Sequence, residues 1–463
     1  MKQKSRLLAA FSLLMAVTML IGCVANPTVA PATVAPATGA PATDAPAPAP
    51  VKVLYWSTSW FPASQEGRKA SVVKFNQEYK GKIEVEYIQG ESSARKQYIE
   101  GGIAAGGGIA CVMEYDARVM DWYSKGYVND LRPYITPEIK AYMTDDQWIA
   151  RTAPDGAIPL SGTTLAEMNF LYYNPAHFEA AGIKPATLDN PWSWDTLFEN
   201  AKLLTVDING KQLGEAGFDK ANVAHWGYIS GLDGEKVIQN GMDYAQMAMG
   251  APIIRQENGK WGWFLDDKGA KAYERYLTSV LAGISPEAAI GMNGDTMNQL
   301  FAEGKVSMLL RATFVRPALV SNFPDFKFAA MPMPMNPDDK MFYVAGGEGL
   351  VMTKYCEQPE AAAEFIFWMM KPENNAIFVF GNGMTPANIG ALDVEPYASD
   401  RDWDIIRSYL KTGVTYITPY NPNLQEFYDT VVAPTLMEVG AGTMSFADAN
   451  KLIQEQAILM LNK

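Results

Sequence analysis

Two kinds of hydrophobic pattern alternate at the start of the globular part of the chain, and this alternation limits the fold more than any other feature. "VKVLYWS" (51–57) is a short run rich in β-forming residues. Val72, Phe75 and Tyr79 then recur at helical spacing, and "KIEVEYI" (82–88) alternates apolar and polar residues as a strand does. A strand, a helix and a strand in this order predict a parallel α/β sheet.

The same two patterns continue downstream. Helices are predicted within 95–107, 174–183, 193–205 and 358–371, strands within 109–116, 168–174 and 327–336, and a helix, a glycine turn and a strand within 294–310. Apolar residues nearly encircle the 358–371 helix, so we expect that helix to be buried.

Length and charge narrow the class of protein. The chain has 463 residues, and the roughly 410 that follow residue 50 are too many for one ordinary core, which predicts two domains or lobes. The net charge of −13 disfavours binding to nucleic acid and to anionic lipid headgroups. No apolar run after residue 50 reaches the length of a membrane-spanning helix.

The N-terminal residues predict export and a lipid anchor. Residues 1–22 have the basic start and short apolar run of a secretion signal. The "LIGC" that ends at Cys23 resembles the bacterial lipobox, in which the cysteine is lipidated and becomes the mature N-terminus. The alternative is an ordinary signal peptide cut nearby, which leaves Cys23 as an unmodified thiol. Residues 23–50, mainly Ala, Pro and Thr, bury too little apolar surface to fold, so we interpret them as a tether behind the lipidated cysteine.

The few cysteines and histidines argue against a metal site and a serine hydrolase. Cys111 and Cys356 are the only cysteines after the tether. Two buried free thiols are the simpler interpretation, and a disulfide is also allowed in an exported protein. The chain has no CxxC motif and no Cys/His cluster, so no structural zinc site is predicted. His177 and His225 accompany no GxSxG motif and are interpreted as structural.

Four stretches together carry a resemblance to a known family. They are "LYYNPAHFEAAGIKPATLDNPWSWDTLFENAKLLT" (171–205), "LFAEGKVSMLL" (300–310), "FKFAAMPMP" with "VAGGEGLVMTKYCEQPEAAAEFIFWMM" (326–370), and "FGNGMTPAN" (380–388). In order and spacing they resemble the extracellular solute-binding proteins of ABC importers, in the group that binds sugars and includes maltose-binding protein. The resemblance covers essentially all of residues 51–463. It departs at Ala110, where the family usually has an acid, and this leaves the register of the 109–116 strand open.

The resemblance implies an α/β fold of the two-lobed, type II periplasmic-binding-protein kind. Three segments, near 160–166, 344–348 and 385–389, would cross a multi-strand hinge, and the lobes would close on a ligand by hinge motion. The expected boundaries are residues 51–162 with 346–386 for lobe 1, and 163–345 with 387–463 for lobe 2.

The candidate site residues follow predicted strands or lie at the second crossing. In open α/β sheets ligands bind beyond the carboxyl ends of the strands. A sugar needs aromatic rings for its C–H faces and polar groups for its hydroxyls. The candidates are Trp56, Ser57, Trp60, Glu91, Tyr115 and Asp116 in lobe 1, Trp226 and Arg311 in lobe 2, and Gly347 and Glu348 at the second crossing. For each the alternative is structural: a tryptophan in the core, a solvated loop acid, or a glycine that the hinge requires.

The resemblance implies a monomeric substrate-binding lipoprotein that captures a carbohydrate, an oligosaccharide in our interpretation, and delivers it to the permease subunits of an ABC transporter. It would face the extracytoplasmic side, touch the membrane only through its lipid, and use no catalysis, cofactor, metal or nucleic acid. A polyamine or a peptide is the alternative ligand for the same fold. An exported glycoside hydrolase with two catalytic carboxylates is the alternative of another class. The sequence names neither the sugar and its linkage nor the permease.

Overall fold

The structure is a computed structural model that describes residues 49–463, except for 59–61, 92–93, 117, 166–167, 235, 337 and 418–420. The predicted signal, the lipidation candidate Cys23, most of the tether and the candidate Trp60 lie outside the described residues. No helix in the described part is both long enough and apolar enough to cross a membrane.

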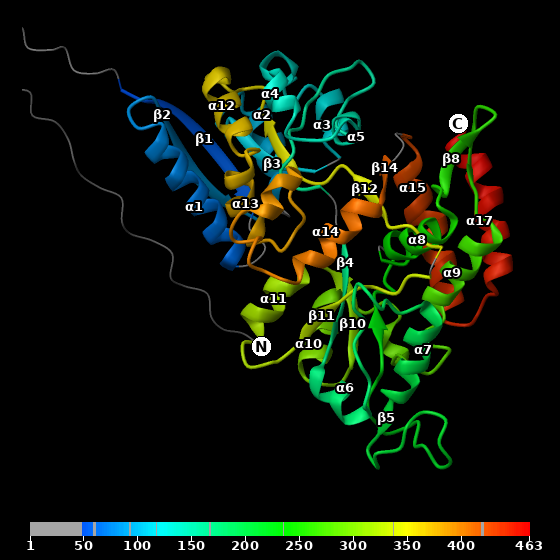
Figure 1. The fold of residues 1–463 in the computed structure, drawn as a ribbon. Helices are drawn as coiled ribbons and strands as arrows, with labels where there is room; N and C mark the ends of the chain where they lie inside the picture. Colours follow the sequence, from blue (N-terminus) through cyan, green and yellow to red (C-terminus); the bar gives the residue numbers. More distant parts are fainter. Residues whose placement is uncertain are drawn as a thin grey trace, which may run out of the picture. The chain divides into compact units, whose positions relative to one another are not determined.

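Three parallel strands and one antiparallel strand form the first sheet. Its strands are β1 (Val51–Thr58), β2 (Ile83–Gly90), β3 (Val112–Tyr115) and β13 (Gly349–Met352), in the spatial order β13–β3–β1–β2 (Figure 1). Thr58 lies opposite Gly90, and Tyr115 lies opposite Gly349. The carboxyl ends of the parallel strands and the beginning of β13 therefore meet at one edge, here named the carboxyl edge. The parallel sheet predicted from the strand–helix–strand pattern is confirmed.

Each face of this sheet has its own hydrophobic cluster, because successive side chains of a strand point to opposite sides. The covering helices are α1 (Pro62–Glu78), α2 (Arg95–Ala104), α3 (Val119–Ser124), α12 (Pro359–Trp368) and α13 (Pro372–Phe380). Val53 and Tyr55 pack with α1, α12 and α13. Trp56 and Met113 pack on the other face with α2 and α3. As predicted, α12 is buried, with seven of its side chains inside the core.

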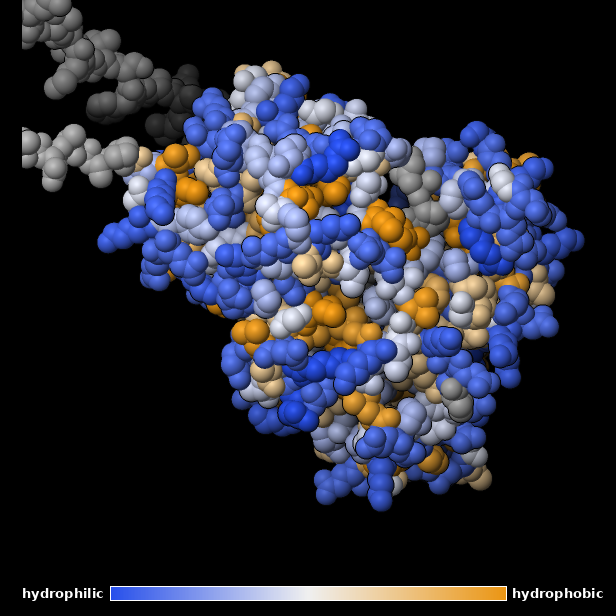
Figure 2. All heavy atoms as spheres, turned by 45° about the horizontal axis from the view of Figure 1, so that its top comes forward, coloured by the Kyte–Doolittle hydropathy of each residue, from blue (hydrophilic) through white to orange (hydrophobic). Residues whose placement is uncertain are grey.

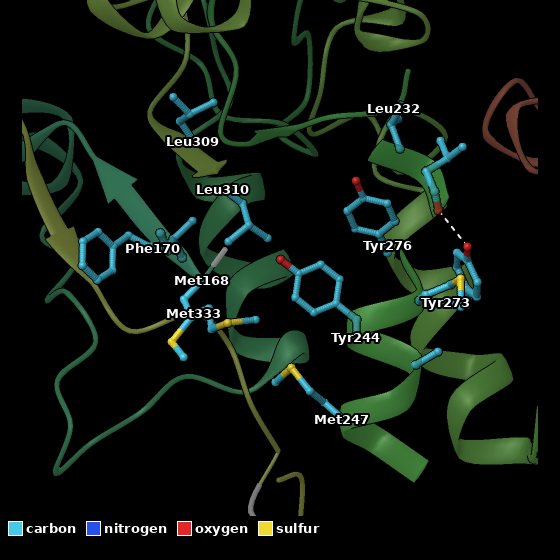
Figure 3. Close-up of a cluster of buried hydrophobic side chains, with 14 of the residues drawn as sticks. Met168, Phe170, Leu232, Tyr244, Met247, Tyr273, Tyr276, Leu309, Leu310 and Met333 are labelled. Atoms are coloured by element: carbon cyan, nitrogen blue, oxygen red, sulfur yellow. Dashed lines mark hydrogen bonds between the residues drawn. The ribbon is translucent and has the colours of Figure 1, made fainter. Parts of the chain in front are cut away.

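A second four-stranded sheet forms from residues farther along the chain. Its order is β11–β4–β10–β7, with β4 Asn169–Tyr173, β7 Ile229–Ser230, β10 Met308–Ala312 and β11 Ala329–Met331. The helices α7 (Trp194–Leu203), α8 (Lys236–Met249) and α9 (Asp267–Leu277) contribute to its core. Phe170 and Leu310 from this sheet belong to the same hydrophobic cluster as Tyr244 and Tyr276 from α8 and α9, and Figure 3 shows Leu310 next to Tyr244. Tyr273 donates its hydroxyl to the Val237 carbonyl at 2.7 Å (Figure 3).

The other elements connect and cover these sheets. They are η2 Arg132–Tyr134, α4 Pro137–Lys140, α5 Asp145–Ile149, α6 Pro175–Ala181, β5 Val206–Asp207, β6 Val223–His225, β8 Ile254–Glu257, β9 Lys260–Trp263, η3 Glu287–Ala289, α10 Gly294–Ala302, α11 Val315–Asn322, β12 Phe342–Ala345, η4 Ile389–Asp393, α14 Trp403–Thr412, β14 Val414–Ile417, α15 Leu424–Phe427, η5 Tyr428–Val432, α16 Ala433–Gly440 and α17 Phe446–Leu461.

Local sequence explains where several of these helices begin and end. The Asn174 side chain accepts the Ala176 N–H at 3.0 Å, and Pro175 occupies the first helical position of α6. Gly182 ends α6 at φ +67°, a left-handed conformation that glycine adopts without strain. Ser193 caps α7 in the same way as Asn174 caps α6.

The three segments that were predicted to cross the hinge are hydrogen-bonded to one another. The N–H groups of Thr163 and Thr164 donate to the Glu348 carbonyl at 2.9 and 3.1 Å. Leu165 N–H donates to the Thr385 carbonyl at 2.9 Å. The buried Arg151 side chain holds the first segment by donating to the Thr164 carbonyl, also at 2.9 Å. The structure is thus two α/β lobes, as predicted, joined by several hydrogen-bonded segments with one β-bridge between Thr164 and Pro386.

The hydrophobic clusters support the expected lobe boundaries, which stay a proposal. The two clusters of the first sheet draw their buried residues from 53–160 and 350–387. The cluster of the second sheet draws almost all of its buried residues from 165–342 and 391–461, with Ala376 as the exception.

The open question of the 109–116 strand is answered by its pairing. Val112 lies opposite Tyr55, so β3 begins after Ala110. Ala110 N–H donates to the Tyr98 hydroxyl at 2.9 Å, and its carbonyl accepts from Thr353 at 2.7 Å. The backbone of Ala110 is therefore held without the acid that the family usually places there.

Cys111 and Cys356 form a disulfide, so the free-thiol interpretation is wrong. Cys111 immediately precedes β3 and Cys356 follows β13, which is antiparallel to β3 with Met352 opposite Val112. This pairing brings together two cysteines that lie 245 positions apart in sequence. Strand pairing over that distance has no signature in the residues next to either cysteine.

Candidate functional site

The lobe 1 candidates gather at the carboxyl edge of the first sheet. Ser57 lies near the end of β1, Tyr115 ends β3, and Asp116 follows it. Gly347 and Glu348 arrive at the same edge because Gly349, the first residue of β13, pairs with Tyr115. The structure therefore brings together residues from three separate parts of the chain, as the rule for open α/β sheets predicts.

A buried ion pair that the sequence reasoning did not select supports this edge. Arg68 of α1 donates Nε to Glu114 Oε1 at 2.8 Å and Nη2 to Glu114 Oε2 at 2.9 Å. Tyr55 and Ser57 also donate their hydroxyls to Oε1, at 2.6 and 2.7 Å. Ser57 is fully buried, so this candidate supports the edge from the interior and has no exposed surface to offer a ligand.

Arg68 stays charged in the interior. Burial lowers the pKa of Arg68, but the charge and hydrogen bonds of Glu114 raise it more, and the net shift is upward. Burial, followed by the Glu114 charge, raises the pKa of Tyr55 far above its usual value. A bidentate guanidinium–carboxylate pair with further hydroxyl donors is the arrangement in which a buried pair is well satisfied.

One sequence signal pointed to Arg68. It precedes Val72 by four residues and Phe75 by seven, so it lies on the helix face that is predicted to be apolar. An arginine on a buried helix face needs an acidic partner, and no rule of local sequence identifies which acid that is.

Asp116 is paired with arginines at the same edge. Arg118 donates Nε and Nη2 to the two Asp116 oxygens at 2.9 and 2.6 Å, and Arg95 lies 3.8 Å from Oδ2. Burial raises the pKa of Asp116, but the hydrogen bonds and charges of these arginines outweigh it and lower the pKa. Tyr115 stacks on Trp122 with ring centroids 3.9 Å apart. The edge therefore combines an ionised acid with a half-buried aromatic ring.

Glu348 differs from the other acids of this edge. Its backbone is fixed, because its N–H donates to Thr164 Oγ1 at 2.6 Å and its carbonyl accepts from Thr163 and Thr164. Its carboxyl group makes no hydrogen bond or ion pair with any other residue that the structure describes, and the residue is partly exposed. Burial, followed by the Glu114 charge, raises its pKa to about 7. Glu348 therefore gains or loses a proton near neutral pH.

Gly347 is required by the close approach of two crossing segments. A Cβ atom at this position would lie 2.4 Å from Thr164 Oγ1 and 2.5 Å from the Thr164 carbonyl oxygen. The hinge geometry thus explains why position 347 is a glycine. A role of the Gly347 backbone toward a ligand stays a prediction.

Trp56 is a core residue, which is the structural alternative named for it. Only 3% of its surface is exposed, and it stacks on Tyr98 with ring centroids 5.5 Å apart. Its ring also covers Gly90. Glu91, which follows β2, is exposed and stays available at the rim.

The structure does not bring the two lobe 2 candidates together. Arg311 lies near the carboxyl end of β10, packed against Gly294, where a Cβ atom would lie 2.5 Å from its guanidinium nitrogens. Trp226 pairs with Val306, before β10 begins. Val306 and Arg311 are five residues apart, which is roughly 16 Å along a strand. Only Arg311 lies at the carboxyl end, where ligands bind in such sheets.

Two surface hollows contain none of these candidates. One, of about 360 Å³, lies between α7 and α9 and is lined by Asp195, Lys202 and Arg275, among others. The other, of about 630 Å³, is lined by residues of α4 and α5 and their neighbours, including Trp148. The molecular face in Figure 2 is largely hydrophilic, with apolar residues in small areas. The carboxyl edge is therefore identified as the candidate site by its residues and their contacts.

Two acids of the carboxyl edge are already engaged by arginines. Glu114 is committed to Arg68 and two hydroxyls, and Asp116 to Arg118. Among the described residues of this edge, Glu348 and the exposed Glu91 are not held by an arginine. Among the described residues no group of three or more His, Cys, Asp or Glu side chains is arranged to hold a metal ion.

Comparisons with known proteins agree with this architecture. The model of the family described as bacterial extracellular solute-binding protein matches residues 58–376. The maltodextrin-binding protein MdxE of Bacillus subtilis is 24% identical over 72% of this chain and 77% of its own length. A protein of Streptomyces antibioticus described as an uncharacterized lipoprotein is 23% identical over 87% of this chain and 85% of its own.

A solved structure extends the likeness to the fold. The cyclic α-maltosyl-1,6-maltose binding protein of Arthrobacter globiformis superposes with a TM-score of 0.70 at 18% identity. The match covers 89% of this chain and 99% of the other. At this identity the likeness concerns the fold.

Proposed function

Because the chain belongs to the bacterial extracellular solute-binding protein family, we propose that it captures a carbohydrate, an oligosaccharide by preference, between its two lobes. It then delivers the sugar to the permease of an ABC importer. The binding is reversible and involves no covalent chemistry. Relatives described as binding maltodextrin and a cyclic maltosaccharide support this ligand class.

The carboxyl edge of the first sheet carries the proposal. It offers an ionised acid at Asp116 and the carboxyl group of Glu348, beside a Tyr115 ring that lies between Trp122 and Arg95. Sugars bind through hydroxyls that donate to carboxyl oxygens. Arg311, at the carboxyl end of β10, supplies donors from the second lobe in this proposal.

We place the protein outside the cytoplasmic membrane as a lipid-anchored monomer. The lipobox-like "LIGC" that ends at Cys23 and the Ala/Pro/Thr-rich segment 23–50 support this placement. A relative described as a lipoprotein supports it as well. A tether of this kind lets the binding lobes meet a membrane permease repeatedly.

Thermal unfolding of the full chain in detergent tests the ligand class. The panel is maltotriose, cyclic α-maltosyl-1,6-maltose, spermidine and a tripeptide. At 100 times its Kd a ligand adds about 2.7 kcal/mol of stability, and at roughly 2–4 °C per kcal/mol this raises Tm by about 5–10 °C. An increase in Tm with one saccharide, which is then recovered unaltered, supports the proposal that the protein is a sugar receptor.

Other outcomes of the same panel would replace the proposal. Hydrolysis of the saccharide would establish the glycosidase. A shift with spermidine or the tripeptide alone would keep the fold and overturn the carbohydrate assignment.

A further inference from the structure

The backbone of Glu348 is held in a fixed place at the carboxyl edge. Its neighbours Gly347 and Gly349 press against the first crossing segment, where a Cβ atom would lie 2.4 Å from Thr164 Oγ1 and 2.0 Å from the Ser161 carbonyl oxygen. Three backbone hydrogen bonds join Glu348 itself to Thr163 and Thr164. The backbone at Glu348 is therefore fixed at this edge, and with it the direction in which the side chain leaves the backbone.

The charges that act on Glu348 come from several elements around the carboxyl edge. They are Arg68 of α1, Arg95 of α2, Glu114 of β3 and Asp116 after β3. The crossing segment presents Ser161, Thr163 and Thr164, which do not titrate. The Arg68 guanidinium is engaged at all three nitrogens, by Glu114, by Ser64 and by Asn382 at 2.7 Å. Arg68 is thus already committed to other partners.

Closure of the two lobes over this edge would remove water from Glu348. Removing water disfavours the charged form of a carboxyl group, and an uncharged sugar brings no positive charge to compensate. We propose, on the basis of the proposed function, that Glu348 takes up a proton when the protein closes around an uncharged saccharide, so that capture weakens as the pH rises above neutral. The protonated carboxyl then donates one hydrogen bond to a sugar oxygen and accepts another from a hydroxyl.

The expected pH dependence follows from the fraction of protein that already carries the proton. With a Glu348 pKa of about 7 in the free protein, the apparent Kd rises roughly tenfold between pH 6 and pH 8 if only the protonated form closes. At pH 8 nearly one proton enters per saccharide bound. Burial lowers the pKa of His177 to about 4 and also lowers that of His225, so neither histidine accounts for this window.

Calorimetric titration of the full chain tests the proposal, with the saccharide that gives the largest shift in the panel. Titrations at pH 6, 7 and 8 give the Kd, and pairs of buffers with different ionisation enthalpies give the protons taken up. Glu348→Gln should remove the pH dependence and the proton uptake. Glu84→Gln changes an exposed acid near the start of β2, away from the carboxyl edge, so it should keep both.

The outcomes separate this inference from the proposed function. A saccharide that binds with the same Kd from pH 6 to pH 8, or without proton uptake, overturns the inference and leaves the receptor standing. An affinity that rises with pH means that Glu348 is ionised in the complex, which also overturns it. If Glu348→Gln fails to fold, the proton uptake measured on the unmodified protein decides whether the inference stands. If no saccharide binds at any pH, the proposed function fails and the inference fails with it.

Discussion

Arg68 Nη1 donates to Asn382 Oδ1 at 2.7 Å, across 314 positions of sequence. The same guanidinium holds Glu114 at the carboxyl edge. Asn382 lies just before the third crossing segment. One buried arginine therefore connects α1, the candidate ligand edge and the approach to the hinge.

Arg68→Met should destabilise the protein strongly. It leaves the Glu114 carboxylate buried without its cation, and removal of one partner of a buried pair costs about 3–5 kcal/mol. Urea unfolding measures the loss. Lys69→Met is the matched control, since Lys69 is exposed and its pair with Glu66 lies at the surface, where such pairs contribute about 0–1 kcal/mol. Equal effects of the two substitutions would contradict the importance of the buried network.

Loss of the Cys111–Cys356 disulfide should lower the unfolding temperature. The bond closes a loop of 245 positions, and removal of a native disulfide typically costs about 2–5 kcal/mol. Thermal unfolding with and without dithiothreitol measures the effect. The double variant Cys111→Ala/Cys356→Ala should unfold at the lower temperature under both conditions. A reductant effect that persists in the double variant would have another origin.

Gly90→Ala should destabilise the first lobe because a Cβ atom there would lie 2.1 Å from the Trp56 ring. Overpacking of this kind costs about 1–3 kcal/mol. Gly101→Ala is the control, since no atom lies within 4 Å of its Cβ position in α2. The free energy of unfolding of Gly101→Ala should therefore be unchanged or rise by up to about 1 kcal/mol. If Gly90→Ala has no effect on denaturant unfolding, Trp56 is free to move and its place in the core is wrong.

Stability should fall between pH 6.5 and pH 4 because of a stacked pair of histidines. His177 and His225 lie with ring centroids 4.0 Å apart, and the Nδ1 atoms of both contact Ser307 Oγ, at 2.9 and 3.1 Å. Burial, followed by the His225 charge, lowers the pKa of His177 to about 4 in the folded protein. A folded pKa below the unfolded value of about 6.5 means that this stabilisation is complete above pH 6.5 and is lost as the pH falls toward 4.

His177→Gln should weaken this acid sensitivity. The free energy of unfolding, measured by urea titration at pH 7, 5.5 and 4.5, should fall less in the variant than in the unmodified protein. Carboxylates with a lowered pKa, such as Asp116 and Asp130, reduce stability only when they gain a proton at lower pH, and they do so equally in both proteins. Parallel pH profiles would show that His177 titrates normally in the folded state.

Sequence reasoning was reliable where a structure depends on neighbouring residues. The run 51–57 and the alternating run 82–88 became β1 and β2, and Pro175 and Gly182 bound α6 as expected. The buried character of α12 was readable because apolar residues surround it. In each case the periodicity of a few residues decides which face is apolar, and burial of that face stabilises the element.

The sequence by itself determined that the chain has two α/β lobes with polar residues after their strands, because strand and helix patterns are local. Only the tertiary structure decided which of those residues meet. Trp56 went into the core and Trp226 to the far end of β10. Arg68 met Glu114, and Cys111 met Cys356. The physical reason is that such contacts depend on the register of strands and helices hundreds of residues apart. A shift of one residue in that register sends a side chain to the opposite face of the sheet.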